Sequence, residues 1–113
     1  MITPSLSEEI TDLHANLCSA LADPRRILII YVLAKQPHTV NDLAEAVGVS
    51  QPATSRHLKT LRDSGLVRAV RQGASVEYSL SDPRLVEALD LLRGVLRDQL
   101  THRASLVEET PAV

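Results

Sequence analysis

The stretch that decides the fold is residues 42–80, DLAEAVGVSQPATSRHLKTLRDSGLVRAVRQGASVEYSL. Its first apolar residues recur at helical spacing up to Gly48, which is a natural C-terminal cap. Ser50 is a natural N-cap for a second helix, which we expect to run from Gln51 to Asp63. Two short helices joined by a tight turn that contains glycine form a helix-turn-helix unit.

Residues 66–80 predict a β-hairpin. Two apolar arms flank the turn-prone segment at residues 72–75, Gln-Gly-Ala-Ser. The second arm, residues 76–80, alternates strictly between apolar and polar side chains, as a half-buried strand does. We therefore expect a wing beside the helix-turn-helix.

Helical patterns precede and follow this unit. The expected start signals are a capping box of Ser5 with Glu8, an N-cap and proline at Asp23-Pro24, Thr39 with Asp42, and again Asp82-Pro83. We expect the second helix to end at Pro37 and the last to cover residues 83–106. The order predicts a mainly α fold with a β-hairpin wing (α+β): a winged helix-turn-helix with extra terminal helices, in one domain of residues 1–113. Within it, residues 39–63 are the helix-turn-helix.

The composition is that of a soluble globular protein. The chain has 113 residues, of which 44 % are hydrophobic and 23 % charged. It has no apolar run long enough to cross a bilayer and no signal-peptide pattern, so we expect a cytoplasmic protein. The single cysteine, Cys18, excludes an intramolecular disulfide and a zinc site built on paired cysteines.

The formal net charge of −2 argues against nucleic-acid binding, because such domains are usually basic. The charge is unevenly distributed, however. Residues 50–76 sum to +4, whereas residues 1–23 sum to −4 and residues 77–113 to −3. Salt screens exposed charges beyond about 8–10 Å, so the binding of a polyanion depends on the local patch. A solvated charged surface would also explain a basic segment, and charge alone does not choose between them.

The helix expected at residues 51–63 has two different faces. Thr54, Leu58 and Leu61 cluster on one side of a helical wheel, which we expect to face the core. The opposite side suits a DNA major groove, where Arg and Lys bond guanine and Gln pairs with adenine. The predicted DNA-binding residues are Gln51, Pro52, Ser55, Arg56 and Lys59 on this helix, Ser50 with the free backbone N–H groups at its start for a phosphate, and Arg68 and Arg71 on the first arm of the hairpin.

Three runs carry a family resemblance: residues 20–34 (ALADPRRILIIYVLA), residues 42–80 and residues 82–85 (DPRL). Residues 50–61, SQPATSRHLKTL, followed by a Gly-Leu-Val strand, are the most specific part. From Leu17 to Leu85 the chain resembles the ArsR family of dimeric, metal- or stress-responsive bacterial repressors.

That resemblance implies that the helix starting at Ser50 reads operator DNA, and that the hairpin, residues 66–80, is the wing. It also implies that the first and last helices, residues 1–22 and 83–106, form the interface of a homodimer. DNA contact is carried over to Gln51, Ser55, Arg56 and Lys59. Two positions depart from the family's pattern: Thr54, where many relatives have an apolar residue, and Ala74, where a basic wing residue is frequent.

The resemblance further implies a sensor site, but the recurrent types are absent or incomplete. Residues 39–63 contain no cysteine, and the last helix has only His102 with Asp98 one turn earlier. His14 and Cys18 lie one turn apart on the first helix. With Asp98 or His102 of a second copy they could complete a tetrahedral site for a divalent metal ion such as zinc. Alternatively, Cys18 is a small buried apolar residue and His14 a polar residue at the helix edge. A third alternative is oxidation of Cys18, or a disulfide between copies.

The leading hypothesis is a homodimeric, sequence-specific transcriptional repressor that is released from its operator by a metal ion or another stress signal. Its partners would be double-stranded DNA and a second copy of the chain, with no membrane. The alternative is a winged helix that contacts a larger protein complex without specific DNA binding. An enzyme is not indicated, because the sequence has no glycine-rich phosphate loop and no nucleophile with an evident base.

Overall fold

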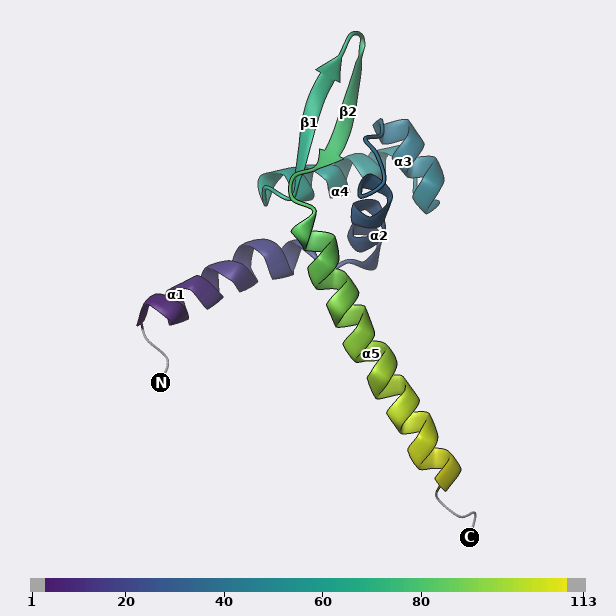
Figure 1. Cartoon of the computed structure of the whole chain (residues 1–113). Helices are drawn as coiled ribbons and strands as arrows, with labels where there is room; N and C mark the ends of the chain where they lie inside the picture. Colours follow the sequence, from purple (N-terminus) through teal and green to yellow (C-terminus); the bar gives the residue numbers. More distant parts are fainter. Residues whose placement is uncertain (1–3, 110–113) are drawn as a thin grey trace. The chain divides into compact units, whose positions relative to one another are not determined.

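The computed structural model describes residues 4–109, and the side chains of residues 5–106 (Figure 1). In chain order the elements are α1 (Pro4–Asp12), the π-helical segment η1 (Leu13–Cys18), α2 (Pro24–Leu33), α3 (Val40–Val47), α4 (Gln51–Asp63), β1 (Val67–Gln72), β2 (Ser75–Leu80) and α5 (Arg84–Glu109). This order confirms the winged helix-turn-helix. The chain divides into two compact units, Met1–Pro83 and Arg84–Val113, and the single domain over residues 1–113 stays a prediction.

The core of the first unit lies where α2, α3 and α4 pack on one another and on the hairpin. Each helix contributes aliphatic side chains to it, and the strand β1 closes one side. Its buried members are Ile29, Ile30 and Leu33 from α2, Leu43 from α3, Leu58 and Leu61 from α4, and Leu66 and Val67 at the start of the hairpin. This core fixes the position of α4 relative to the wing.

The helix-turn-helix is built by the caps that its sequence predicts. Gly48 has a φ of +68°, and the N–H of Val49 donates to the carbonyl of Ala44, which closes a Schellman motif at the end of α3. Gly65 has a φ of +75° and closes the same motif after α4, where Leu66 N–H donates to Leu61. Glycine suits both positions because L side chains rarely adopt this backbone conformation.

Other expected boundaries were right in part. Asp23 is the N-cap of α2, since its carboxylate accepts from the N–H of Arg25 at 2.8 Å, and Thr39 is the N-cap of α3. The capping box at Ser5 is wrong, because α1 already contains Pro4 and Ser5 lies inside the helix. Proline favours the first helical turn, so the helix begins before the serine. The start of the predicted range 1–22 lies outside the described residues.

Two helix ends also differ from expectation. The helix α2 ends at Leu33, before Pro37, because the residues between them form a turn. The last helix begins at Arg84, directly after Asp82-Pro83, and continues to Glu109 rather than ending at residue 106.

The wing is a two-stranded antiparallel sheet. Val67 pairs with Leu80 at its base and Gln72 with Ser75 at its tip, so the connecting turn has two residues. The first of these, Gly73, has a φ of +63°. At the base, His38 and Tyr78 exchange two backbone hydrogen bonds of 3.0 and 2.7 Å, which tie the α2–α3 loop to β2.

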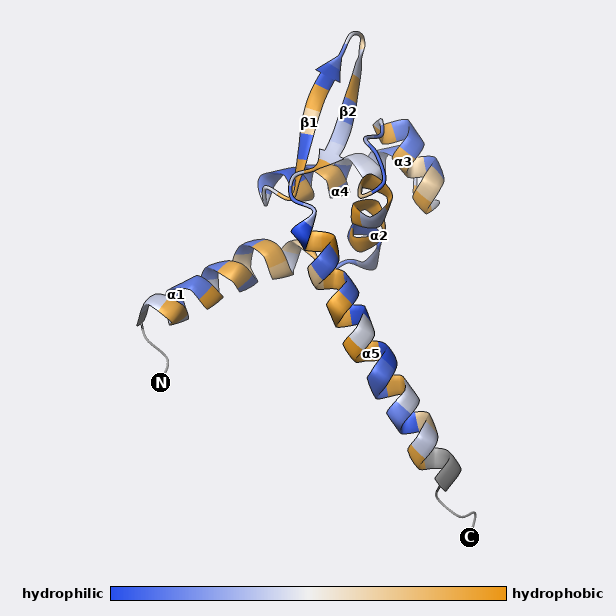
Figure 2. Ribbon diagram, viewed as in Figure 1, coloured by the Kyte–Doolittle hydropathy of each residue, from blue (hydrophilic) through white to orange (hydrophobic). Residues whose placement is uncertain are grey.

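The terminal helices expose apolar side chains in the single chain. Hydrophobic residues recur along both helices (Figure 2). On α1 and η1 these are Leu6, Ile10 and Leu13, which are 41–49 % exposed. On α5 they include Leu91, Leu92, Val95, Leu96 and Leu100, which are 50–73 % exposed. None of the described helices has a stretch long and apolar enough to cross a membrane.

Candidate nucleic-acid interface

The start of α4 is held by Ser50, whose hydroxyl oxygen accepts from the N–H of Ala53 at 3.3 Å. Pro52 has no N–H to offer. The N–H of Gln51 is therefore the first-turn donor that remains for a phosphate, together with the hydroxyl proton of Ser50. Of the several backbone N–H groups expected to bind a phosphate, only that of Gln51 is left, and the hydroxyl of Ser50 is the second donor.

The two faces of α4 are separated as the helical wheel predicts. Thr54, Leu58 and Leu61 are 0 %, 1 % and 0 % exposed. The departure at Thr54 is accommodated, because its hydroxyl donates to the carbonyl of Ser50 at 2.9 Å and leaves no buried group unpaired. The predicted reading residues Gln51, Pro52, Ser55, Arg56 and Lys59 are all exposed. The periodicity that buries one side of this helix also gathers the polar side chains on the other.

The two cations of this face differ in their surroundings. Lys59 Nζ lies 2.9 Å from Oδ2 of Asp63, one turn later, and both side chains are well exposed. Such a surface ion pair contributes little to stability, so the ammonium group of Lys59 can readily leave Asp63 and pair with another anion. Arg56 forms no ion pair with any described residue. Its guanidinium is thus the one more directly available to a base edge or a phosphate.

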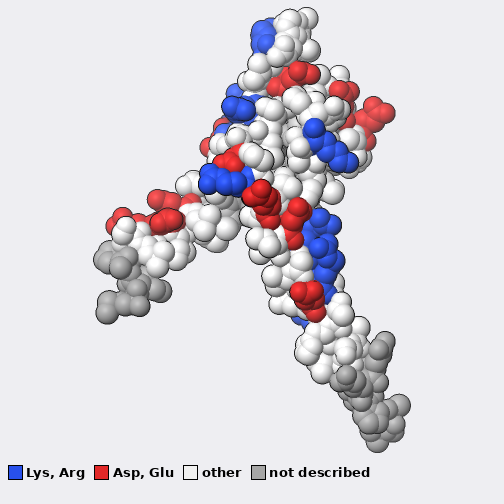
Figure 3. Space-filling model, viewed as in Figure 1, with Lys and Arg blue, Asp and Glu red and all other residues white. Residues whose placement is uncertain are grey.

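The arginines of the wing point to opposite faces of the hairpin. Arg68 pairs with Ser79 near the base and Arg71 with Val76 near the tip, three residues further along the strand. Successive strand residues alternate between faces, so an odd separation places these side chains on different sides. Both are exposed. Basic side chains lie at the outer end of the hairpin, while acidic ones lie over α1 and α3 (Figure 3).

The comparison with known proteins bears on this arrangement. The family model described as "Bacterial regulatory protein, arsR family" matches residues 23–69, from the cap of α2 into β1. The nodulation protein NolR of Rhizobium meliloti is 36 % identical over 110 residues, which cover 97 % of this chain and 87 % of that protein. The chain belongs to the arsR family. It is a winged helix-turn-helix, DNA-binding transcriptional regulator and not an enzyme.

Two further family members are similar to this chain over most of its length. The HTH-type transcriptional regulator NmtR of Mycobacterium tuberculosis is 45 % identical over 76 residues, but the match spans only 63 % of its length. Among solved structures, the homodimeric winged helix-turn-helix DNA-binding domain Mb0332 from Mycobacterium bovis superposes with a TM-score of 0.75. It is 28 % identical, and the match covers 88 % of this chain and 93 % of that domain.

The residues predicted to bind metal lie on two separate units of this arsR-family chain. His14 and Cys18 lie in η1 and both are exposed, so the alternative of a buried Cys18 is wrong for the single chain. Asp98 and His102 are exposed on α5. The described residues include no group of three or more His, Cys, Asp or Glu that could hold a metal ion. A tetrahedral site at His14 and Cys18 would need ligands from a second copy.

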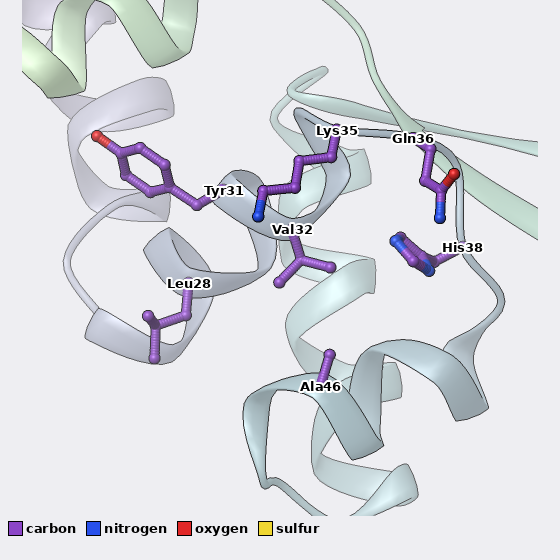
Figure 4. A pocket seen from close by; sticks show the side chains of 7 residues that line it. All are labelled: Leu28, Tyr31, Val32, Lys35, Gln36, His38 and Ala46. Atoms are coloured by element: carbon purple, nitrogen blue, oxygen red, sulfur yellow. The ribbon is translucent and has the colours of Figure 1, made fainter.

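Two features of this arsR-family chain were missed by sequence reasoning. One is a contact between Arg26 of α2 and His57 on the inner side of α4, described below. The other is a hollow of about 510 Å³ between α2 and α3, whose lining includes Val32, Lys35, His38 and Ala46 (Figure 4). None of the predicted DNA-binding residues lines this hollow.

Proposed function

We propose that the protein is a homodimeric repressor that binds a two-fold-related operator in a sequence-specific manner. The observation that carries the proposal is the division of α4 into a fully buried face and an exposed face bearing Gln51, Ser55, Arg56 and Lys59. A helix held rigidly from behind and polar in front can enter a major groove without rearrangement. Base edges there distinguish all four base pairs, which gives sequence specificity.

The wing would add contacts outside the groove that α4 occupies. Because Arg68 and Arg71 face opposite sides of the hairpin, only one of them can point to a given stretch of backbone. Arg68 lies at the base, next to the strand start that packs on α4, and Arg71 lies near the tip. We assign Arg68 to the phosphates beside the reading helix and Arg71 to the neighbouring minor groove.

Dimerisation would cover the apolar side chains that the terminal helices expose. Leu92, Leu96 and Leu100 recur along α5, and Leu6, Ile10 and Leu13 along α1 and η1. Large exposed apolar patches mark interfaces, and a two-fold axis uses the same patch on both copies. Two recognition helices would then meet major grooves about 34 Å apart. The homodimeric state of Mb0332 supports this arrangement.

Release from the operator would come from a metal ion or another stress signal that acts on the dimer. His14 and Cys18 supply two exposed ligands one turn apart, and Asp98 or His102 of a second copy would supply the others. A divalent ion bound there would bridge the two copies and change the spacing of their recognition helices.

The test is a binding titration of the purified protein against the DNA upstream of its own gene, with a scrambled duplex of equal length as control. We expect tighter binding to the natural duplex, one dimer per site, and an affinity that falls with added salt. Transcription from that promoter in a reconstituted reaction should decrease when the protein is added. Equal affinity for both duplexes would favour the protein-interaction alternative, and binding that is indifferent to salt would contradict the phosphate contacts.

A further inference from the structure

Arg26 joins three segments of the first unit. Its Nε donates to the carbonyl of Ala20 at 2.6 Å, and Nη2 donates to the carbonyl of Ser19 at 3.3 Å. Its Nη1 lies 3.3 Å from Nδ1 of His57 in α4 and 4.0 Å from Oδ2 of Asp23. The guanidinium therefore links the end of the N-terminal helix, the start of α2 and the recognition helix.

The carbonyls of Ser19 and Ala20 belong to the last turn of the N-terminal helix, the helical run of residues 4–20, where backbone acceptors lack α-helical partners, although the Ser19 carbonyl also accepts from the N–H of Ala22 at 3.3 Å. A cation is favourable at that position because of the helix dipole. The arginine side chain is only 17 % exposed, so water cannot readily replace these bonds. The orientation of the N-terminal helix and the position of Arg26 are thereby coupled.

The contact with His57 requires a neutral imidazole. A guanidinium has only donors and stays protonated in proteins, so Nδ1 must be the acceptor and the ring proton must sit on Nε2. His57 is 9 % exposed, on the inner side of α4 among the residues that pack against the core. A second proton would replace the hydrogen bond by two opposed N–H groups and by the repulsion of two cations.

We propose that Arg26 and His57 are positioning residues that hold the recognition helix against the N-terminal helix, so that protonation of His57 releases α4 and weakens DNA binding. The proposal rests on the DNA-binding function proposed above. It adds a route by which a change at the N-terminal helix, which we assign to the dimer interface, reaches the residues that read DNA.

The charged groups around the imidazole agree with this reading. From the start of α2, Asp23 favours the protonated ring, whereas Arg25 and Arg26 disfavour it, as does Arg56 from α4 itself. Among the described residues, no charged group of α3 or β1 forms a hydrogen bond or ion pair with His57. Burial and the three arginines together lower the pKa of His57 below its ordinary value of 6.5, with burial the largest cause. The neutral ring therefore predominates at neutral pH.

The experiment compares DNA affinity at about pH 5 and about pH 8, the limits between which an imidazole titrates, at constant ionic strength. The probe is the duplex upstream of the protein's own gene. We expect the wild type to bind about tenfold more weakly at the lower pH, the size of losing one hydrogen bond to a charged group. His57→Gln keeps a neutral acceptor and should bind as the wild type does at high pH, with a flat pH profile.

Two more variants separate positioning from folding. Arg26→Lys keeps the charge but cannot reach all three segments, so it should weaken binding about tenfold at both pH values without unfolding the protein. His38→Gln removes another imidazole of the same unit, one whose ring forms no hydrogen bond with any described residue, and it should keep the wild-type pH profile. Thermal melts of each variant at both pH values verify that the folded form is present.

A measurement made without DNA tests the coupling between His57 and the N-terminal helix separately from the proposed DNA-binding function. In NMR spectra, the amides of Ser19 and Ala20 should shift with the same midpoint as His57, and His57→Gln should abolish the shift. A wild-type pH profile that matches His57→Gln, or a His57 that titrates without any response at Ser19 and Ala20, would overturn the coupling. Coupled shifts in a protein that binds no duplex would instead contradict the proposed function.

Discussion

Replacing Arg56 by alanine tests the reading face most directly. The side chain is exposed, forms no ion pair with any described residue, and lies opposite the buried face of α4. Its removal therefore creates no cavity and no unpaired buried group. An exposed substitution of this kind changes stability by less than about 0.5 kcal/mol. Any loss of DNA binding would then arise from the missing contact itself.

The size of that loss follows from the chemistry of the groove. A bidentate contact between arginine and guanine contributes about 1–3 kcal/mol of discrimination. Arg56→Ala should therefore weaken binding to the natural duplex about 5- to 150-fold per contact. If Arg56 contacts only a phosphate, Arg56→Ala should lose the same affinity for every DNA sequence. The slope of log affinity against log salt concentration should then become shallower by about 1 per contact.

The assay is fluorescence anisotropy with a labelled duplex over a range of salt concentrations. The matched control is Arg62→Ala, which removes the same charge from an exposed position on the same helix, outside the predicted contacts. We expect Arg62→Ala to remain close to wild type. If Arg56→Ala keeps the wild-type affinity and salt dependence, the assignment of this face to DNA contact is refuted. If both variants lose the same affinity, Arg56 contributes only through its net charge and not through a specific contact.

Four further predictions concern stability, assembly and metal binding. Urea denaturation should show that Gly48→Ala destabilises the protein by about 1–2 kcal/mol, because residue 48 has a φ of +68°. Gly94→Ala should instead stabilise the protein by about 0.5–1 kcal/mol, because Gly94 lies inside α5 and nothing lies within 4 Å of the new methyl group. Hydrogen bonds from Arg25 lower the pKa of Asp23 to about 2. The Asp23 carboxylate therefore stabilises the folded protein fully above its ordinary pKa of 3.8, and this stabilisation is lost as the pH falls through about 2. Asp23→Asn keeps the helix cap, and its acid unfolding curve should lack this loss of stability. Leu96→Glu should turn a dimer into a monomer in sedimentation experiments, while Leu96→Met should not. Zinc or another divalent ion that copurifies with the protein should be lost in Cys18→Ser, and a metal-free wild type that binds DNA fully would exclude this site.

Local signals predicted the helix-turn-helix well. The caps at Asp23, Gly48 and Ser50 each depend on groups within five residues of the cap, so the sequence contains everything that forms them. The same holds for the two faces of α4, which follow from periodicity alone. The opposite faces of Arg68 and Arg71 could also have been recognised, because their odd separation is visible in the sequence.

The errors came from patterns that compete locally. Ser5 and Glu8 have capping-box spacing, but Pro4 fits the first turn of a helix and places the start before the serine. The π-helical turns of η1 were not expected, because the residues 13–18 have ordinary helical spacing. There Ser19 N–H donates to His14, five residues back. Nothing in the local sequence distinguishes that bond from the α-helical one.

The contact between Arg26 and His57 could not be found by periodicity. The two residues are 31 positions apart and meet only because α2 and α4 pack together. From the sequence, His57 could be placed only at the edge of the core. A buried histidine is commonly just a satisfied polar group, and only the guanidinium at its Nδ1 distinguishes this one.

The small net charge of the chain bears on how it would recognise DNA. Non-specific affinity grows with the number of phosphates that a protein neutralises. Here residues 50–76 sum to only +4, Lys59 is paired with Asp63, and acidic side chains lie over α1 and α3 on the face that Figure 3 shows. A protein with weak non-specific attraction depends more on base contacts for its total affinity. Such contacts tolerate little displacement of the helix that makes them. The position of α4 should therefore matter more here than in a strongly basic protein, in keeping with the role that we propose for the part-buried contact between Arg26 and His57.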